Sequence, residues 1–370
     1  MARTIGVIGG GQLARMMIAP AIELGIEIKV LAETEGSPAQ LAATQVGDYK
    51  DLETVRAFAK TVDVLTFDHE HVPLQVLETL EAEGFKFEPS SKALRFAQNK
   101  LDMRKRLAEL GVPIPAWAEV NSAAELDEFI SSHGSVAILK TPTGGYDGKG
   151  VRVVRSSADA SDWLALGHPL LVEEKVDFVR ELAQLTARNR SGEFKAWESV
   201  QTIQRDGVCA EVLSPAPNAN FELAAQIAEK IAVGLDVTGV LAVELFETAD
   251  GKLVVNELAM RPHNSGHFSI EGTLTSQFEQ HLRAVLDLPL GEVSASANFA
   301  VMLNLLGTDN QNSFVEHYDK ALKSAPGAHI HTYGKAARAG RKMGHVTALS
   351  NLSLEDARAK ALAAHQALQA

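Results

Sequence analysis

The chain opens on a short strand pattern that runs through three glycines directly into a helical pattern. Residues 4–8 are largely apolar, as in a buried strand, and residues 12–24 have helical spacing that ends at Gly25. Further strand patterns follow at residues 26–31 and 62–67. Strands that alternate with helices over connections of this length form parallel sheets with helices packed on their faces. The sequence therefore predicts an α/β fold that begins with a parallel sheet.

The pattern changes in the second hundred residues. Residues 111–115 contain two prolines and a glycine and predict a linker or domain edge. Residues 136–140 and 151–154 predict two short strands on either side of a glycine-rich loop. Near the end of the chain, Ser353 followed by Asp356 predicts the start of an alanine-rich helix.

Composition excludes several classes of function. The formal net charge of −12 disfavours non-specific binding to a nucleic-acid backbone, although local groups of cations can still hold small phosphorylated ligands. Cys209 is the single cysteine, which excludes an internal disulfide and a cysteine-based zinc site. No apolar run is long enough for a membrane span, and the first residues lack the apolar core of a signal peptide. We expect a soluble cytoplasmic protein.

The three glycines belong to the first candidate binding motif. Residues 9–14 fit the dinucleotide pattern G-x-G-x-x-A, and Glu33 follows the second strand pattern where a ribose-binding acid would sit. Such a loop brings the backbone close to a ligand and offers the amides of a helix N-terminus to an anion. The motif indicates a phosphate more strongly than a dinucleotide. A tight turn that merely packs the helix on the sheet is the alternative.

The second motif is the glycine-rich loop between the two short strands. Four glycines lie within residues 144–150, and Lys140 and Lys149 add positive charge. No helix follows, so this is not the phosphate loop of P-loop proteins. A loop between two strands with such a permissive backbone predicts a flexible lid that closes over phosphates. A plain hairpin loop is the alternative.

The third motif is a predicted hairpin at residues 239–258. If Asp250 and Gly251 form a two-residue turn, Glu244 lies directly opposite Glu257. Two facing carboxylates repel each other unless a cation lies between them. Their oxygens suit an Mg²⁺ ion that also binds ATP phosphates. A solvated pair of acids is the alternative.

Three polar clusters complete the candidates. Residues 261–267 contain an arginine, an asparagine and two histidines that could hold an anionic intermediate or move protons. Glu70 follows a strand pattern and could accept hydrogen bonds from sugar hydroxyls. Lys335 and Arg341 belong to four cations within eight positions and could grip a phosphate. Solvated polar loops are the alternative in each case.

Together these motifs resemble the ATP-grasp superfamily and, within it, the N5-carboxyaminoimidazole ribonucleotide synthetases of purine biosynthesis. The resemblance covers nearly the whole chain and is most specific at residues 9–16, 139–151, 239–246, 256–267 and 333–345. It implies three domains. These are a Rossmann-like domain at residues 1–98, an ATP-grasp domain at 99–295 with a mobile lid at about 116–178, and a small C-terminal domain at 296–370.

The resemblance implies an ATP site with phosphates at two lysines and the lid, adenine near residues 173–176, ribose at Glu181, and Mg²⁺ at Glu244 and Glu257. The implied ATP-binding residues are Lys100, Lys140, Gly145, Tyr146, Asp147, Gly148, Lys149, Gly150, Val151, Glu173, Glu174, Lys175, Val176, Glu181, Asn256 and Glu257. The chain departs from the family pattern at Met260, where proline is usual, and at Ala259, where many relatives in the superfamily have asparagine.

The second substrate implied is 5-aminoimidazole ribonucleotide. Its implied binding residues are Gly11, Gln12, Leu13, Glu70, Tyr146, Asp147, Lys335 and Arg341, and the implied catalytic residues are Arg261, His263 and Asn264. The implied reaction is an ATP-dependent carboxylation, in which bicarbonate and ATP form carboxyphosphate and the carboxyl group passes to the exocyclic amine. The resemblance also implies a homodimer.

Three other functions compete with this interpretation. A formate-dependent phosphoribosylglycinamide formyltransferase shares the metal-binding acids and the basic C-terminal cluster, but residues 145–150 and 262–267 favour the carboxylating enzyme. An NAD-dependent oxidoreductase would explain residues 9–14 alone. A non-catalytic nucleotide-binding regulator would need neither the paired acids nor the cluster at residues 261–267.

Overall fold

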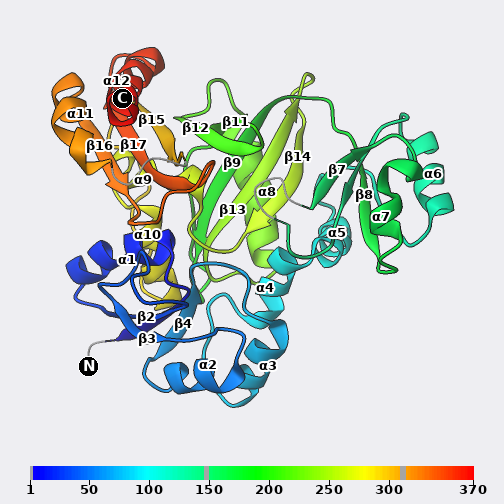
Figure 1. Ribbon diagram of the computed structural model, residues 1–370, viewed down its shortest axis with the longest axis horizontal. Coiled ribbons are helices and arrows are strands. Elements are labelled where there is room, and N and C mark those ends of the chain that lie inside the picture. Colours follow the sequence, from blue (N-terminus) through cyan, green and yellow to red (C-terminus); the bar gives the residue numbers. More distant parts are fainter. Residues whose placement is uncertain (1–2, 146–149, 309–313) are drawn as a thin grey trace.

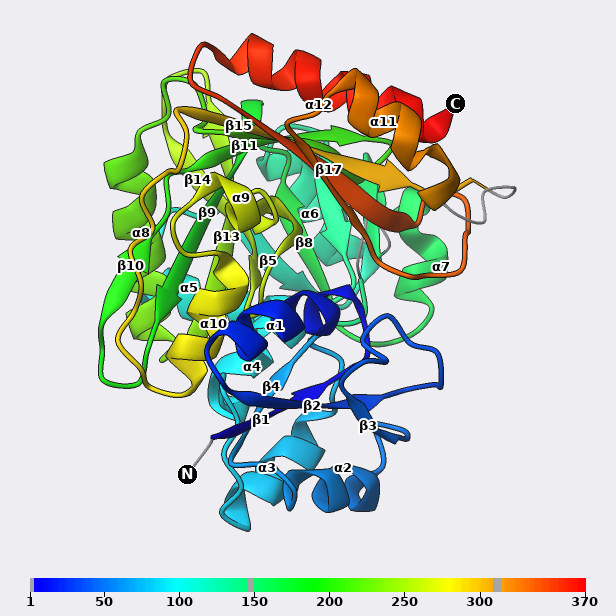
Figure 2. The ribbon, with the colours of Figure 1, turned by 90° about the vertical axis from the view of Figure 1, so that its left-hand side faces the viewer.

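The computed structural model describes residues 3–145, 150–308 and 314–370 of the chain. Figure 1 shows three parts: an N-terminal part at the lower left, residues 117–174 at the right, and a large sheet that extends from the centre to the upper left. Figure 2 shows the N-terminal sheet below the large sheet. Within the described ranges, no helix is both long and apolar enough to cross a membrane.

The N-terminal sheet has four parallel strands in the order β3-β2-β1-β4. They are β1 (Thr4–Ile8), β2 (Glu27–Ala32), β3 (Ala43–Val46) and β4 (Val64–Phe67). The helices are α1 (Gln12–Glu23), α2 (Leu52–Ala59), α3 (Leu74–Ala82) and α4 (Ser91–Gln98). Helix α1 covers one face and helices α2 and α3 the other, which is why every residue of β1 is buried (Figure 2). The prediction of a parallel α/β sheet is confirmed, and the three predicted strands lie within two residues of their expected bounds.

Helix α5 (Lys100–Glu109) leads through the predicted linker into the right-hand part. This part contains an antiparallel sheet in the order β5-β8-β6-β7. Its elements are β5 (Trp117–Val120), α6 (Ala123–Ser132), β6 (Ala137–Lys140), β7 (Val151–Val154), η1 (Ser157–Ala160), α7 (Ser161–Leu164) and β8 (Leu170–Glu174). Strands β6 and β7 flank the glycine-rich loop, as predicted. Tyr146, Asp147, Gly148 and Lys149 of that loop lie outside the described residues.

The large sheet is antiparallel and runs β14-β13-β9-β11-β12-β15-β17-β16, with β10 paired to β9. Its strands are β9 (Phe178–Arg188), β10 (Phe194–Ala196), β11 (Val200–Arg205), β12 (Val208–Ser214), β13 (Gly239–Thr248), β14 (Leu253–Ala259), β15 (Phe299–Leu306), β16 (Ala328–Thr332) and β17 (Lys342–Ser350). The helices around it are α8 (Phe221–Gly234), η2 (Asn264–Gly266), α9 (Ser269–Gly272), α10 (Gln277–Val285), η3 (Val315–His317), α11 (Tyr318–Ser324) and α12 (Leu354–Gln369). Pairing of β12 with β15 makes the sheet continuous across residue 296, where the sequence predicts a domain boundary.

The last helix has the predicted cap and a small-residue face. The side chain of Ser353 accepts a hydrogen bond from the backbone N–H of Asp356 at 3.1 Å, so the predicted start of α12 is confirmed. Ala357, Ala361 and Ala364 are fully buried along one face of the helix. This alanine face lets α12 approach strands β15 and β17 closely and closes the C-terminal core.

His281 ties the N-terminal sheet to the large sheet. The ring is fully buried on α10. Its Nδ1 accepts a hydrogen bond from the backbone N–H of Val240 at 3.0 Å, so the proton lies on Nε2 and is donated to the Thr66 hydroxyl at 2.7 Å. Burial lowers the pKa of His281 to about 3. The imidazole is therefore neutral, and in this form it links β4 to β13.

We expect His281→Leu to destabilise the protein by about 2–4 kcal/mol, because two buried polar partners lose their hydrogen bonds. The pH dependence should change as well. The unfolded chain takes up a proton on this histidine near pH 6.5 whereas the folded chain does not, so wild type loses about 2 kcal/mol through this group between pH 7 and pH 5.

Urea unfolding at pH 7 and pH 5 measures both effects. The variant should lose less stability on acidification than wild type. His168→Leu, which changes an exposed histidine, serves as the control and should keep the wild-type pH dependence. Equal pH dependence in His281→Leu and wild type would contradict this assignment.

Candidate active site

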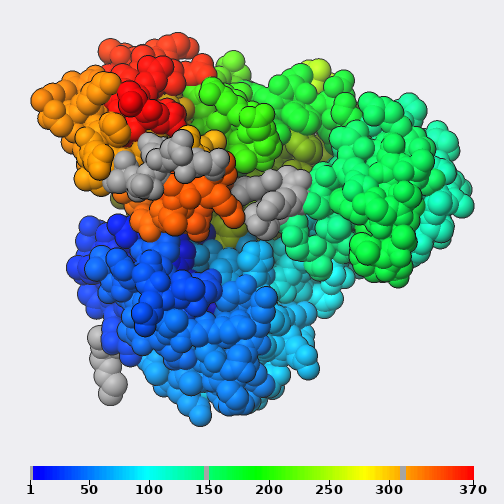
Figure 3. All heavy atoms as spheres, viewed as in Figure 1, coloured from blue at the N-terminus to red at the C-terminus, as the bar shows by residue number. Residues whose placement is uncertain are grey.

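A cavity of about 1710 Å³ lies where the three parts of the molecule meet. Figure 3 shows the surface hollowed between the N-terminal part, the C-terminal strands and the right-hand part. Most of the predicted site residues line it. They are Gln12, Leu13, Glu70, Lys100, Lys140, Gly145, Val151, Glu173, Glu174, Lys175, Val176, Glu181, Glu244, Asn256, Glu257, Arg261, His263, Asn264, Lys335 and Arg341. Gly11 and Gly150 are not part of this lining.

The paired glutamates lie on β13 and β14 at an irregularity in the hairpin. Near the turn Glu247 pairs with Leu253, and Thr248 N–H donates to the carbonyl oxygen of Lys252 at 3.0 Å. The turn therefore contains three residues, 249–251, and the predicted two-residue turn is wrong. A β-bulge, in which Glu244 opposes both Asn256 and Glu257, restores the predicted pairing beyond it.

The pKa of Glu244 reflects both its burial and its acidic neighbour. Burial, and then the negative charge of Glu257, raise the pKa of Glu244 to about 7. The Nε2 atom of His263 lies 3.4 Å from a carboxylate oxygen of Glu244, and the ammonium of Lys100 lies 3.6 Å from Glu257. Among the described residues, no group of three or more His, Cys, Asp or Glu side chains could hold a metal ion. Mg²⁺ in phosphate-binding sites nevertheless takes only one or two carboxylates from the protein, and the phosphates and water supply its other ligands. Glu244 and Glu257, next to the side-chain amide of Asn256, match such a site.

A buried ion-pair network positions Lys140. Its ammonium lies 2.8 Å from Glu173 Oε2 and donates to the Asn256 side-chain oxygen at 3.2 Å. Glu173 also forms an ion pair with the fully buried Arg104, whose guanidinium donates to the carbonyl oxygen of Asn256 at 2.7 Å. Burial opposes the charge on Glu173, but Arg104 and Lys140 outweigh it and lower its pKa. The carboxylate of Glu173 is thus engaged within the protein, and sequence reasoning missed Arg104.

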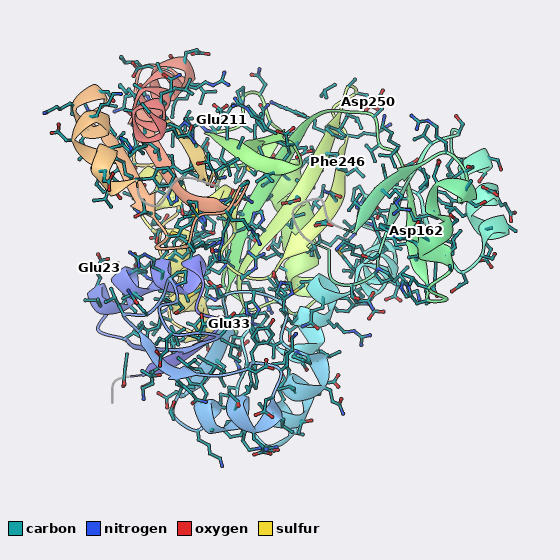
Figure 4. All side chains as sticks on the ribbon, in the orientation of Figure 1. Glu23, Glu33, Asp162, Glu211, Phe246 and Asp250 are labelled. Carbon is teal, nitrogen blue, oxygen red and sulfur yellow. The ribbon has the colours of Figure 1, made fainter. Side chains whose placement is uncertain are left out.

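Two aromatic side chains also line the cavity. Phe178 and Phe246 stack with ring centroids 4.4 Å apart, and Figure 4 labels Phe246 on the large sheet. Gln204 lines the same region and donates to Glu181 at 2.8 Å, while burial raises the pKa of Glu181. Neither phenylalanine nor Gln204 was predicted. The only sequence signal for them is their position on strands that flank predicted residues.

The glycine loop before α1 binds carboxylates of the chain itself. Asp68 accepts a hydrogen bond from the backbone N–H of Ala14 at 2.8 Å, so it occupies the helix N-terminus where an external anion was predicted. Glu33, labelled in Figure 4, accepts from the backbone N–H of Gly10 at 3.0 Å and from His69 at 3.1 Å. The bond to His69 is the main reason that the pKa of Glu33 falls to about 2. Glu33 is therefore engaged in the loop rather than free to bind ribose.

Glu70 also binds within the protein. One carboxylate oxygen accepts from the backbone N–H of Met260 at 3.2 Å, and the other accepts from Arg261 Nε at 2.6 Å. The sequence predicts Glu70 as an acceptor for sugar hydroxyls. In the structure this carboxylate fixes Arg261 at the edge of the cavity, and its contact with a sugar stays a prediction.

The basic C-terminal segment closes the far end of the cavity. Lys335 and Arg341 line it, as do Arg338 and Lys342, which the sequence-based site omits. The Arg341 guanidinium donates to the carbonyl oxygen of Ala336 at 3.1 Å. Paired carboxylates and lysines thus line one part of the cavity, and Lys335, Arg338 and Arg341 line another. Lys342 lies close enough to Glu244 that its charge partly offsets the raised pKa of that carboxyl.

We expect Gly11→Ala to lower the free energy of unfolding by about 1–3 kcal/mol, because overpacking forces neighbouring atoms to move. An added Cβ would lie 2.0 Å from Asp68 Oδ2, although the backbone angles of Gly11 suit alanine. Gly327→Ala, where no atom lies within 4 Å of the added Cβ, is the matched control. Thermal unfolding of Gly11→Ala, Gly327→Ala, Asp68→Ala and the double variant Gly11→Ala/Asp68→Ala checks the origin. If the destabilisation of the double variant equals the sum of the two single changes, the contact with Asp68 is not the cause of the Gly11→Ala effect.

Known domain families match three consecutive parts of the chain. The ribonucleotide synthetase preATP-grasp domain matches residues 1–98, and the ATP-grasp domain matches residues 105–278. The phosphoribosylaminoimidazole carboxylase C-terminal domain matches residues 300–360. The predicted ATP-grasp fold is confirmed.

Similar proteins extend over nearly the whole length. The N5-carboxyaminoimidazole ribonucleotide synthase of Mycobacterium tuberculosis is 48% identical over 99% of this chain and 88% of that protein. The enzyme of the same name from Corynebacterium ammoniagenes is 45% identical over 95% of this chain and 88% of that protein. A crystal structure of the Aspergillus clavatus synthase in complex with ADP and 5-aminoimidazole ribonucleotide matches with a TM-score of 0.89. It is 34% identical and covers 100% of this chain and 99% of that one.

These similarities support the carboxylating ligase over the formyltransferase that the sequence left as an alternative. The hairpin at residues 239–258 and the C-terminal cations at residues 335–342 lie within the matched domains. The chain therefore belongs to the family of N5-carboxyaminoimidazole ribonucleotide synthases, ATP-dependent ligases of purine biosynthesis that are built on the ATP-grasp fold.

Proposed function

We propose that the chain catalyses the ATP- and bicarbonate-dependent carboxylation of 5-aminoimidazole ribonucleotide to N5-carboxyaminoimidazole ribonucleotide. The observation that carries this proposal is a single cavity with two ends of different chemistry. Paired carboxylates and two lysines line one part of it, and Lys335, Arg338 and Arg341 of the basic C-terminal segment line another. Two phosphorylated substrates can thus face each other across Arg261 and His263. The Aspergillus clavatus relative binds ADP and the ribonucleotide together, which supports this arrangement.

ATP would occupy the end formed by the right-hand part and the hairpin. Lys140 and Lys100 would contact its phosphates, since both ammonium groups line the cavity near the glutamate pair. Adenine would lie against Val176 and the stacked rings of Phe178 and Phe246, and Glu181 would accept from the ribose. The remaining ATP-binding predictions, including the lid residues that lie outside the described ranges, stay predictions.

Glu244 and Glu257 would hold Mg²⁺ together with the ATP phosphates. Burial is the main cause that raises the pKa of Glu244, and the charge of Glu257 adds to it. A cation between the two carboxylates would favour their charged forms, which supports this role. When bound, the ion would neutralise charge on the transferred phosphoryl group. Asn256 lies at the same bulge but already accepts a hydrogen bond from Lys140.

The ribonucleotide would occupy the opposite end of the cavity. Lys335 and Arg341 would bind its 5′-phosphate, and Arg338 and Lys342 add further positive charge. Gln12 and Leu13 line the cavity next to this segment and would contact the sugar and ring. We assign Glu70 to the orientation of Arg261, since both of its oxygens bind residues 260–261.

The reaction would proceed between these ends in two steps. An oxygen of bicarbonate attacks the γ-phosphorus, the bond to the β-phosphate breaks, and ADP and carboxyphosphate form. The exocyclic amine then takes the carboxyl group, phosphate leaves, and the amine gives up one proton. Arg261, held by Glu70, would stabilise the anionic intermediate. A closed cavity would protect that intermediate from water.

His263 would act as a neutral hydrogen-bond donor. Its Nδ1 accepts from the backbone N–H of Ser265 at 3.4 Å, so Nε2 carries the proton and faces Glu244. Burial is the main cause that lowers the pKa of His263 to about 3, so the ring stays uncharged at neutral pH. Asn264 exchanges hydrogen bonds with Asn304, which leaves its proposed catalytic role to be tested. The three-domain boundaries, the homodimer and the cytoplasmic location also stay predictions.

We expect purified protein to release ADP from ATP and Mg²⁺ when both bicarbonate and 5-aminoimidazole ribonucleotide are present. A coupled assay for ADP, with each component omitted in turn, measures this dependence. Mass spectrometry of the unstable product, or of its trapped form, identifies the carboxylated ribonucleotide. ADP release that requires glycinamide ribonucleotide and formate instead would overturn the proposal in favour of the formyltransferase.

We expect Glu257→Gln to lower kcat by roughly a hundredfold or more, as the loss of one group that stabilises transition-state charge does elsewhere. The fold should remain intact, because the change keeps the shape of the side chain and removes the negative charge that adds to the effect of burial on the pKa of Glu244. Asp250→Asn, which changes an exposed acid in the turn of the same hairpin, is the control and should keep wild-type kcat. Wild-type ADP formation in Glu257→Gln would exclude the proposed metal role.

A further inference from the structure

Gln277 packs against the turn at residues 261–267, which carries Arg261 and His263. It is the first residue of α10 and is fully buried. Its side-chain Oε1 accepts from the backbone N–H of His263 at 2.8 Å, and its Nε2 donates to the carbonyl oxygen of the same residue at 2.8 Å. His263 has an extended backbone, with φ −120° and ψ 153°. One side-chain amide thus pairs both backbone groups of His263, as a neighbouring strand would.

This pairing fixes which way the amide of Gln277 points. Only its oxygen can accept from the N–H of His263, so its nitrogen is the atom that donates elsewhere. That nitrogen also donates to Nδ1 of the fully buried His267 at 2.9 Å. His267 therefore carries its proton on Nε2. The ring lines the cavity, and this Nε2 has no hydrogen-bond partner among the described residues.

The turn is closely fitted to Gln277. A Cβ at Gly266 would lie 2.4 Å from Gln277 Oε1, so only glycine lets the turn approach this closely. The hydroxyl of Ser269 accepts from the backbone N–H of Gln277 at 2.9 Å and donates to the carbonyl oxygen of Gly266 at 2.6 Å. The turn and the start of α10 therefore form one hydrogen-bonded unit.

We propose that Gln277 is a positioning residue for the carboxylation, acting through His263 and His267. It lies outside the cavity lining, so it would act without touching a substrate. Its amide sets the backbone of His263, whose Nε2–H faces Glu244 at 3.4 Å, and it sets which nitrogen of His267 carries the proton. The inference rests on the proposed function, since it assigns Gln277 to the geometry of that reaction.

The same helix provides a matched control. Gln280 is also fully buried, its Oε1 accepts from the backbone N–H of Gly291 at 2.7 Å, and its Nε2 donates to the carbonyl oxygen of that glycine at 2.8 Å. Gln280 and Gly291 lie outside the cavity lining. Gln277→Glu and Gln280→Glu thus make the same chemical change in the same kind of backbone pairing. Each keeps an acceptor oxygen and loses the donor N–H₂.

The test compares kcat and KM for ATP in both variants, with ribonucleotide-dependent ADP release as the assay and circular dichroism to measure the folded fraction. We expect kcat per folded molecule to fall at least tenfold further in Gln277→Glu than in Gln280→Glu, with KM for ATP within twofold of wild type. Equal kcat in the two variants, or a loss confined to KM for ATP, would overturn the inference.

If Gln277→Glu does not fold, Gln277→Met and Gln280→Met allow the same comparison with the same criteria. Failure of the proposed function would be distinguishable, because wild type itself would then show no ribonucleotide-dependent ADP release. Wild-type activity together with equal variants would reject only the role of Gln277.

Discussion

Repulsion between Glu244 and Glu257 is the constraint around which the cavity is arranged. The bulge places two carboxylates together in a setting where burial and mutual charge raise the pKa of Glu244 to about 7. Positive charge or hydrogen-bond donors must therefore surround the pair. Lys100 and the N–H of His263 supply part of this, at 3.6 and 3.4 Å. The remaining deficit of positive charge is the physical basis for a site that binds a cation together with a polyphosphate.

Carboxylates of the chain itself hold the cations and the loops around that pair. Glu173 fixes Lys140, Glu70 fixes Arg261, and Asp68 occupies the N-terminus of α1. Each of these acids could be taken from the sequence for a ligand-binding group. Their internal bonds orient the cationic side chains before any substrate arrives, and such preorganisation is what makes electrostatic stabilisation effective in catalysis. Gln277 extends the same principle to backbone groups.

The hairpin shows how a sequence-based prediction can reach the right pair through a wrong turn. The two strands are predicted from their apolar runs, and the two glutamates are recognised by their residue type within those runs. The turn has three residues instead of two, and this difference alone would have shifted the register by one residue and separated the pair. The bulge at Glu244 compensates for it. A pattern of apolar residues does not reveal a bulge. Whether one residue opposes one or two residues of the next strand depends on how the strands pair, and the composition of each strand is the same in both cases.

The sequence by itself determined the parallel N-terminal sheet and the order of the motifs, and most of the site residues that it predicts line the cavity. These features depend on local patterns and on residue chemistry. Only the tertiary structure decided which partner each charged group takes. Glu70 meets Arg261 across 191 residues, and Arg104 meets Glu173 across 69. Such pairs form because separate sheets and helices pack together, and nothing in the neighbouring sequence of either partner specifies the other.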